Sequence, residues 1–204
     1  MRSFNLAAVM LCVSAAIGLG SFALLAPAAA ASKAPDPAYH DGDKLAAKPS
    51  ATTAYKTTSW DALMPKNWDP VASMKSLNLG IMQDGDPRTI AALEELKRQW
   101  NNAPIEPGLD GAKIRIAGFL IPLDAEGEKL HEFLLVPYFG ACIHTPPPPA
   151  NQVIHVTLAT PAKGHQMMEA IWVNGTMHTG STDTAMGTSG YSMDGVSVAR
   201  YTGQ

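Results

Sequence analysis

The residues best suited to chemistry lie in one short stretch, where Cys142 and His144 are followed by the proline run Pro146–Pro149. A thiolate and an imidazole are both zinc ligands, and a histidine beside a cysteine also suits a nucleophilic thiol and its base. In an extended backbone, residues two apart point to the same side, so we expect Cys142 and His144 to face one point. The prolines stiffen the backbone that follows, which lowers the entropy lost on binding. The stretch therefore predicts a metal site or a reactive thiol.

A metal site needs more than these two ligands, because structural zinc takes four and catalytic zinc takes three and a water. Glu132 is the next candidate, and we predict a metal site formed by Cys142, His144 and Glu132. Zinc is the expected ion, with copper as the alternative. Further candidates are the histidines of the flanking sequence: His131, His155, His165 and His178. Copper would also favour soft methionine sulfur, which is found at Met167, Met168 and Met177.

Composition and charge exclude two classes of protein. The chain has 204 residues, of which 46% are hydrophobic, and this apolar content is too high for a wholly disordered chain. Its 15 Lys and Arg residues face 18 Asp and Glu residues, and only five of the basic residues lie in 112–204. Nucleic-acid-binding surfaces need clustered positive charge, so we expect no nucleic-acid partner.

The N-terminal segment 1–31 has the composition of a secretory signal. A single positive charge precedes a long uncharged stretch that ends in a run of alanines. We predict an exported, periplasmic protein, with cleavage near Ala30 or Ala31. Cleavage would remove Cys12 and leave Cys142 as the one thiol of the mature chain. An uncleaved anchor is the alternative, since about 20 apolar residues can span a bilayer, and we expect contact with the membrane only through this segment.

The rest of the chain divides by composition. Large aliphatic side chains are nearly absent from 32–58, which predicts a flexible linker. The remainder is predicted to form a single globular domain, 59–204, with a helical part at 59–104 and a β part at 112–204. At the start of this domain, the large side chains of Trp60, Leu63 and Trp68 are expected to pack onto the core.

Two helices are predicted in the helical part. Asp86 followed by Pro87 is a typical helix start, and Asn101, Asn102 and Pro104 mark its end. A second start at Asp69–Pro70 is followed by a stop at Gly80. Apolar residues recur at helical spacing in both segments, so we expect each helix to cover the core with its apolar face: Val71, Met74 and Leu77 in the first, and Ile90, Leu93, Leu96 and Trp100 in the second.

From Lys113 onward, short apolar stretches predict about five strands. They lie near 113–123, 133–138, 152–158, 171–177 and 195–201, and a polar turn is expected at 124–128. Gly118 interrupts the first strand, as a bulge or a close approach would. Five strands are enough to close a small barrel, and the protein is therefore predicted to be mainly β. We predict an OB-like five-stranded barrel with one or two N-terminal helices packed on it, and a split sandwich is the alternative.

The stretch Glu132–Gln152, with the sequence EFLLVPYFGACIHTPPPPANQ, resembles the signature of a family of exported bacterial proteins, domain of unknown function 3299. The resemblance extends over residues 60–201 and includes several shorter matches: Trp60–Pro65, Asp86–Pro87, Gly118–Asp124, Trp172–Gly175 and Gly190–Ser192. It implies a periplasmic or lipid-anchored protein associated with transport systems, some of them linked to zinc, and no established reaction. Within the matched signature, it implies a metal site at Cys142 and His144, with Glu132 next.

Three functions remain open. The first is a metal-binding or metal-handling accessory to a membrane transporter complex. The second is a thiol-dependent enzyme or redox protein in which His144 lowers the pKa of Cys142. We favour a protein that is not an enzyme, because no third orienting residue is evident. The third is an interaction module that uses the proline strip with Tyr138 and Phe139.

Overall fold

The structure is a computed structural model, and it describes residues 39–46, 54–77, 86–126, 129–142 and 147–202. The predicted signal peptide, its cleavage site and most of the predicted linker lie outside the described residues. His144 and the expected helix stop at Gly80 lie outside them as well.

Chain contacts divide the protein into two units, Met1–Pro37 and Ala38–Gln204, and the second unit holds every described residue. Among the described helices, none is long and apolar enough to cross a membrane.

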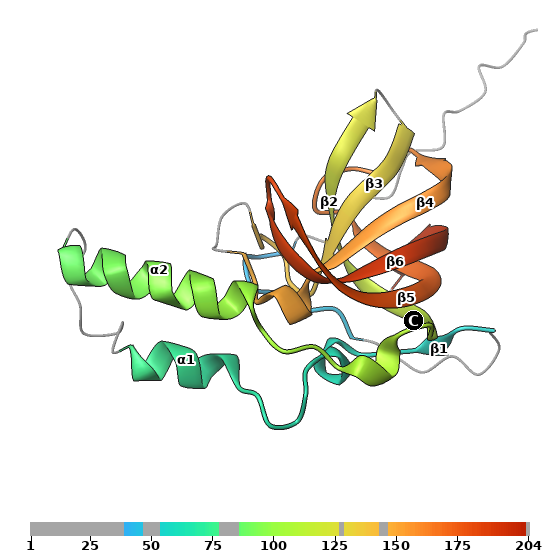
Figure 1. The fold of residues 1–204 in the computed structure, drawn as a ribbon. Coiled ribbons are helices and arrows are strands. Elements are labelled where there is room, and N and C mark those ends of the chain that lie inside the picture. Colours follow the sequence, from blue (N-terminus) through green and yellow to red (C-terminus); the bar gives the residue numbers. More distant parts are fainter. Residues whose placement is uncertain (1–38, 47–53, 78–85, 127–128, 143–146, 203–204) are drawn as a thin grey trace, which may run out of the picture. The chain divides into compact units, whose positions relative to one another are not determined.

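Five strands form a closed barrel (Figure 1). They are β2 (Lys113–Glu126), β3 (Lys129–Val136), β4 (Ile154–Lys163), β5 (Ala170–Thr184) and β6 (Gly187–Arg200). Their order is β2-β3-β4-β6-β5, and β5 pairs again with β2 to close the sheet. The β4–β6 pair is parallel and the other barrel pairs are antiparallel. The five-stranded OB-like barrel is therefore confirmed. A short sixth strand, β1 (Lys56–Thr57), runs parallel to β2.

The alternation of apolar side chains explains the barrel. One side of β2 and β3 packs in the main core, which includes Ile116, Phe133 and Leu135. The opposite side packs in a second cluster, which includes Phe119 and Leu134. The second half of β3, residues 133–136, is buried on both faces, so its sequence is a continuous apolar run instead of an alternating one.

Several strand boundaries differ from the prediction, and β3 (Lys129–Val136) and the far end of β4 (Lys163) are among them. β2 continues through residues 124–126, so the polar turn begins later than expected. β5 and β6 extend to Thr184 and from Gly187, because they pair as a long hairpin to its tip. The hairpin tip is largely polar and partly exposed, and an apolar pattern could not reveal it. β4 starts at Ile154 because Ala150–Gln152 forms a 3-10 helix, η4.

Helices α1 (Pro70–Ser76) and α2 (Pro87–Asn101) begin where predicted. The side chain of Asp86 accepts a hydrogen bond of 2.8 Å from the backbone N–H of Arg88, and Asp69 does the same for Val71. Such caps satisfy N–H groups that have no partner inside the helix.

The expected apolar faces of these helices are not all covered. Leu96 is buried, but four apolar side chains are 42–52% exposed: Val71, Met74, Ile90 and Leu93. The expectation that these four pack on the core is wrong. The physical reason is that α1 packs on α2 and only α2 meets the barrel with several contacts, at β6, so the barrel covers only part of the apolar face of α2.

Of the three large side chains expected to pack on the core, Trp60 and Leu63 do so, and Trp68 is half-buried and belongs to neither cluster of the described residues. Leu63, in the 3-10 helix η1 (Trp60–Leu63), is fully buried in the main core. The indole Nε1 of Trp60 donates a 2.7 Å hydrogen bond to the carbonyl oxygen of Ala117 in β2. The side-chain amide of Gln152 donates to the carbonyl oxygen of Trp60 at 3.0 Å. A few large side chains thus hold the segment on the barrel.

Candidate functional site

Cys142 lies in the tight loop that follows β3. Gly140 has φ 83° and Cys142 itself has φ 64°, so both are left-handed. A residue with a Cβ rarely adopts this conformation, and such strain is concentrated at functional sites. The expectation of an extended backbone at Cys142 is wrong, because the chain turns sharply here. The convergence of its thiol with the imidazole of His144 stays a prediction, since His144 lies outside the described residues.

The thiol of Cys142 is half-buried against the second cluster, and Met186 packs against the same cluster. Gly187 lies beside it, since a Cβ placed there would be 4.0 Å from the Cys142 sulfur and 3.2 Å from Pro147 Cβ. Burial raises the pKa of the Cys142 thiol to about 11. The free thiol is therefore protonated at neutral pH.

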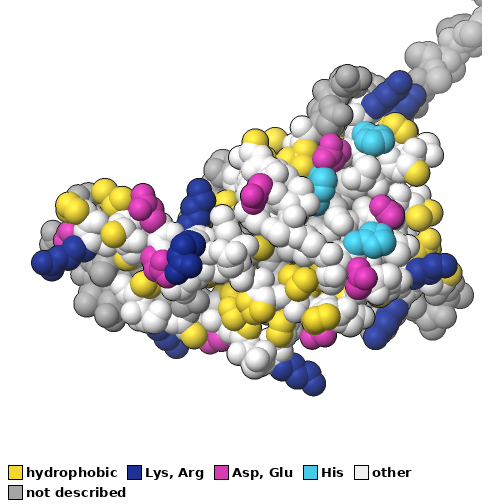
Figure 2. All heavy atoms as spheres, in the orientation of Figure 1, with side chains coloured by type: hydrophobic (Ala, Val, Ile, Leu, Met, Phe, Trp, Pro, Cys, Tyr) yellow, Lys and Arg dark blue, Asp and Glu magenta, His cyan; other side chains and the backbone are white. Residues whose placement is uncertain are grey.

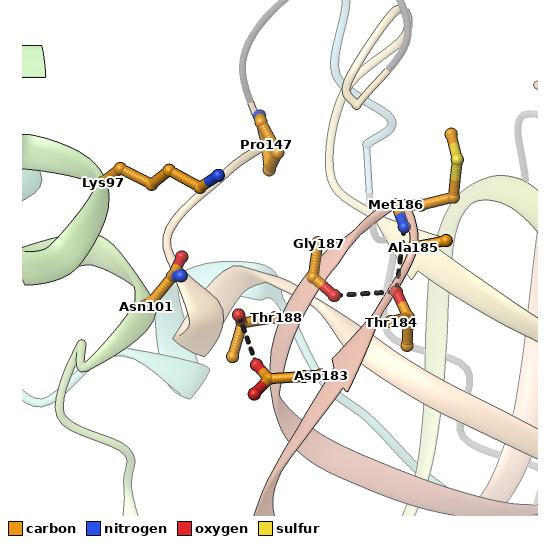
Figure 3. Close-up of a pocket in the computed structure, with 9 residues that line it drawn as sticks. All are labelled: Lys97, Asn101, Pro147, Asp183, Thr184, Ala185, Met186, Gly187 and Thr188. Atoms are coloured by element: carbon orange, nitrogen blue, oxygen red, sulfur yellow. Dashed lines mark hydrogen bonds between the residues drawn. The ribbon is translucent and has the colours of Figure 1, made fainter. Parts of the chain in front are cut away.

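A cleft of about 320 Å³ has Gly187 among its lining residues (Figure 3). Its walls come from α2, from Pro147 and from the tip of the β5–β6 hairpin, with these lining residues: Lys97, Asn101, Pro147, Asp183, Thr184, Ala185, Met186, Gly187 and Thr188. Hydrogen bonds hold the hairpin tip in place. Thr188 Oγ1 donates to Asp183 Oδ1 at 2.7 Å, and Thr184 Oγ1 donates to the Gly187 carbonyl oxygen at 2.7 Å.

Pro147, in the proline run, is the one residue of this cleft that sequence reasoning placed beside a candidate site. Lys97 and Asp183 are far apart in the chain, and neither belongs to a recognisable motif. The glycine near the hairpin tip is the one local signal, and it indicates a turn, not a site.

Glu132 has a different partner from the one predicted. Its Oε1 lies 2.5 Å from Nε2 of His155, on the neighbouring strand β4. Figure 2 shows histidine side chains close to acidic ones on one face of the molecule. Among the described residues, no group of three or more His, Cys, Asp and Glu side chains is arranged to hold a metal ion. The metal site of Cys142, His144 and Glu132 therefore stays a prediction. Its central residue, Cys142, lies in the described part of the chain.

Two of the other candidate histidines, His165 and His178, pair with acidic side chains as well. His165 Nδ1 lies 3.3 Å from Glu169, which also forms a 3.0 Å ion pair with Arg200. His178 Nε2 lies 3.0 Å from Asp194. His131 is exposed on β3.

Much of the signature stretch serves the architecture. Pro148 and Pro149 are buried, and Pro149 has the polyproline backbone expected of it, with φ −54° and ψ 146°. Asn151 is fully buried and donates to the Pro104 carbonyl oxygen at 2.8 Å. The proline strip that an interaction module would need is therefore not exposed at Pro148 and Pro149. None of these architectural contacts involves the thiol of Cys142. Cys142 therefore remains the candidate functional residue of the signature stretch.

The sequence model of one family, "Protein of unknown function (DUF3299)", matches residues 60–200. The chain belongs to this family. A crystal structure of a DUF3299 family protein from Pseudomonas aeruginosa PAO1 is similar to it, with 31% sequence identity and a TM-score of 0.57. The similarity covers 73% of this chain and 97% of that chain. A search of curated proteins found no match. Cys142 and every residue that lines the cleft lie inside the DUF3299 match.

The raised pKa makes a direct prediction for this DUF3299 protein. Alkylation of Cys142 at pH 7 is expected to be roughly 300-fold slower than that of free cysteine, because a pKa near 11 instead of about 8.5 leaves far less thiolate. The rate should rise about tenfold per pH unit up to pH 10. Stopped-flow labelling of the Cys12→Ser variant measures this, since Cys142 is then the only thiol. A rate that levels off below pH 9 would contradict it.

Proposed function

We propose that this DUF3299 protein is an exported, periplasmic metal-handling protein that serves a membrane transporter complex. Its metal centre uses the Cys142 thiolate and the His144 imidazole, with Glu132 as a further ligand. The observation that carries the proposal is the position of the Cys142 sulfur, half-buried in a left-handed loop and close to Gly187 at the wall of the cleft. The predicted signal segment 1–31 supports export.

The environment of the thiol suits a cation that replaces its proton. Burial disfavours the thiolate when it stands alone, and a bound metal ion supplies the compensating positive charge. Because each binding event releases the thiol proton, affinity rises with pH in the neutral range. Zinc is the ion that a Cys and His ligand pair favours. Met186, which packs against the same apolar cluster as Cys142, favours copper as the alternative.

The same pKa argues against a thiol enzyme. Reactive cysteines have a lowered pKa, which is produced by a nearby cation or a helix N-terminus. Here burial is the cause of the shift and its direction is upward. A metal ligand tolerates a high thiol pKa, because the metal itself deprotonates the sulfur.

Metal titration of the purified full chain tests the proposal. We expect Cys142→Ser to weaken Zn²⁺ binding by at least about 100-fold, since a hydroxyl is a poor substitute for a thiolate. Binding is measured by competition with a chromophoric chelator under reducing conditions, and a parallel titration with Cu⁺ distinguishes the two ions. Cys12→Ser is the matched control, because it removes the other thiol of the chain and is expected to leave affinity unchanged. Equal affinity of wild type and Cys142→Ser would refute the metal centre.

A Glu132→Gln variant in the same titration tests the third ligand. The contact of Glu132 with His155 uses Oε1, so the carboxylate can bind the ion through Oε2. A loss of about 10-fold is expected for a single carboxylate ligand. Unchanged affinity would remove Glu132 from the centre and leave Cys142 and His144 in it.

A further inference from the structure

Two opposite charges face the cleft and do not neutralise each other. Lys97 lies on α2, and Asp183 lies near the end of β5. Neither forms an ion pair with any other residue in the described part of the chain. The neighbouring Arg98, in contrast, is paired with Glu95 at 2.6 Å. The cleft therefore separates a cation from an anion.

A polar side chain lies beside each of the two charged side chains of the cleft. Asp183 accepts a 2.7 Å hydrogen bond from Thr188 Oγ1, which holds its carboxylate and leaves Oδ2 without a protein partner among the described residues. Asn101 lies four residues after Lys97, so the two side chains lie on the same face of α2. Figure 3 shows both projecting from α2 toward Pro147 and the hairpin.

The chemistry of the cleft selects a ligand with both charges. A ligand with only a negative charge would pair with Lys97 and leave Asp183 unpaired. A ligand with only a positive charge would pair with Asp183 and leave Lys97 unpaired. A volume of about 320 Å³ matches the lower end of the range for small-molecule sites, about 300–1,000 Å³. The ring of Pro147, in the wall of the cleft, is apolar and suits contact with a short hydrocarbon group.

We propose that the cleft binds a small zwitterion of the α-amino-acid type. Lys97 and Asn101 bind its carboxylate, Asp183 binds its ammonium group, and Pro147 contacts its side chain. This site goes beyond the metal-handling function and does not depend on it, because none of these contacts uses Cys142 or His144.

Three related probes test the proposal: L-alanine, propionate, which lacks the amino group of alanine, and ethylamine, which lacks its carboxyl group. L-Alanine carries both charges, propionate carries only the carboxylate, and ethylamine carries only the ammonium group. In calorimetric or NMR titrations of the metal-free full chain with a chelator present, L-alanine is expected to bind at least about 10-fold more tightly than either single-charge probe. Equal affinity for the three probes, or no L-alanine binding at millimolar concentration, would overturn the proposal.

Charge-removing variants assign the contacts. Lys97→Met and Asp183→Asn are each expected to weaken L-alanine binding by about 10-fold or more. Asparagine keeps the acceptor that Thr188 needs, and Lys97 is exposed, so both variants retain the fold. Lys113→Met, which removes an exposed lysine away from this cleft, is the matched control. Wild-type L-alanine affinity in both Lys97→Met and Asp183→Asn would overturn the site.

The metal-binding proposal and the zwitterion-binding proposal are refuted by different results. Cys142→Ser is expected to leave L-alanine affinity unchanged, and Lys97→Met is expected to leave Zn²⁺ affinity unchanged. Loss of L-alanine binding in Cys142→Ser would contradict the contacts proposed for the zwitterion, whatever the outcome of the metal titration.

Discussion

We expect Tyr191→Phe to lower the free energy of unfolding by about 3 kcal/mol, although it removes a single oxygen atom. The Tyr191 hydroxyl donates a 2.7 Å hydrogen bond to the Leu63 carbonyl oxygen and accepts one of 2.6 Å from the Glu106 backbone N–H. Tyr191 itself is fully buried. Phenylalanine leaves both backbone groups without their partner, and each buried group left so costs about 1–3 kcal/mol.

Thermal and urea unfolding measure this loss. For a domain of this size, the midpoint is expected to fall by roughly 6–12 °C. Tyr201→Phe is the matched control, because the Tyr201 hydroxyl donates its 2.7 Å hydrogen bond to the Ala46 carbonyl oxygen in an exposed position. The control is expected to cost less than about 1 kcal/mol. Similar losses in the two variants would show that Tyr191 does not anchor the segments around Leu63 and Glu106.

The barrel was predictable because its signals are local and repeated. Ile114, Ile116 and Leu120 lie at period two on one side of β2, and all three are buried in the main core. Helix starts were predictable for a similar reason, since a capping aspartate and the proline after it are neighbours in sequence. In both cases the residues that determine the local structure stand within a few positions of one another.

The sequence did not predict the features that depend on distant partners. The backbone at Cys142 turns left-handed while the chain leaves β3, and the sequence pattern suggested a strand. The exposure of Ile90 and Leu93 depends on where α2 meets the barrel, which a helical period does not specify. The separation of Lys97 from Asp183 arises only when α2 lies beside the β5–β6 hairpin.

The candidate site is thus predictable in part. Cys142 stands out as the one cysteine outside the predicted signal segment 1–31, and this is visible in the sequence. Its protonation state is not, because burial against apolar side chains raises the pKa and burial follows from tertiary packing. The sequence therefore identifies Cys142 as a candidate ligand, and only the fold shows the apolar environment of its thiol.

Gly118→Ala is the second substitution with a large expected effect, because β2 and β3 approach closely at Gly118. A Cβ at this position would lie 2.7 Å from Leu135 Cγ and 2.8 Å from the Val136 carbonyl oxygen. Real Cβ contacts essentially never come below 3.0 Å. No register shift falls at Gly118, so close approach, not a bulge, explains the glycine. We expect a loss of about 1–3 kcal/mol in the free energy of unfolding, which is typical of overpacking a core.

Urea unfolding of Gly118→Ala and of Gly180→Ala tests this explanation. An added Cβ at Gly180 meets no atom within 4 Å, so the same chemical change is expected to alter stability by less than about 0.5 kcal/mol there. Leu135→Ala in the Gly118→Ala background separates the two contacts, because it removes the side chain and leaves the Val136 carbonyl oxygen in place. If the leucine carries the clash, the double variant is more stable than the sum of the two single losses predicts. Additive losses would place the strain on the backbone contact with Val136, which no side-chain substitution relieves.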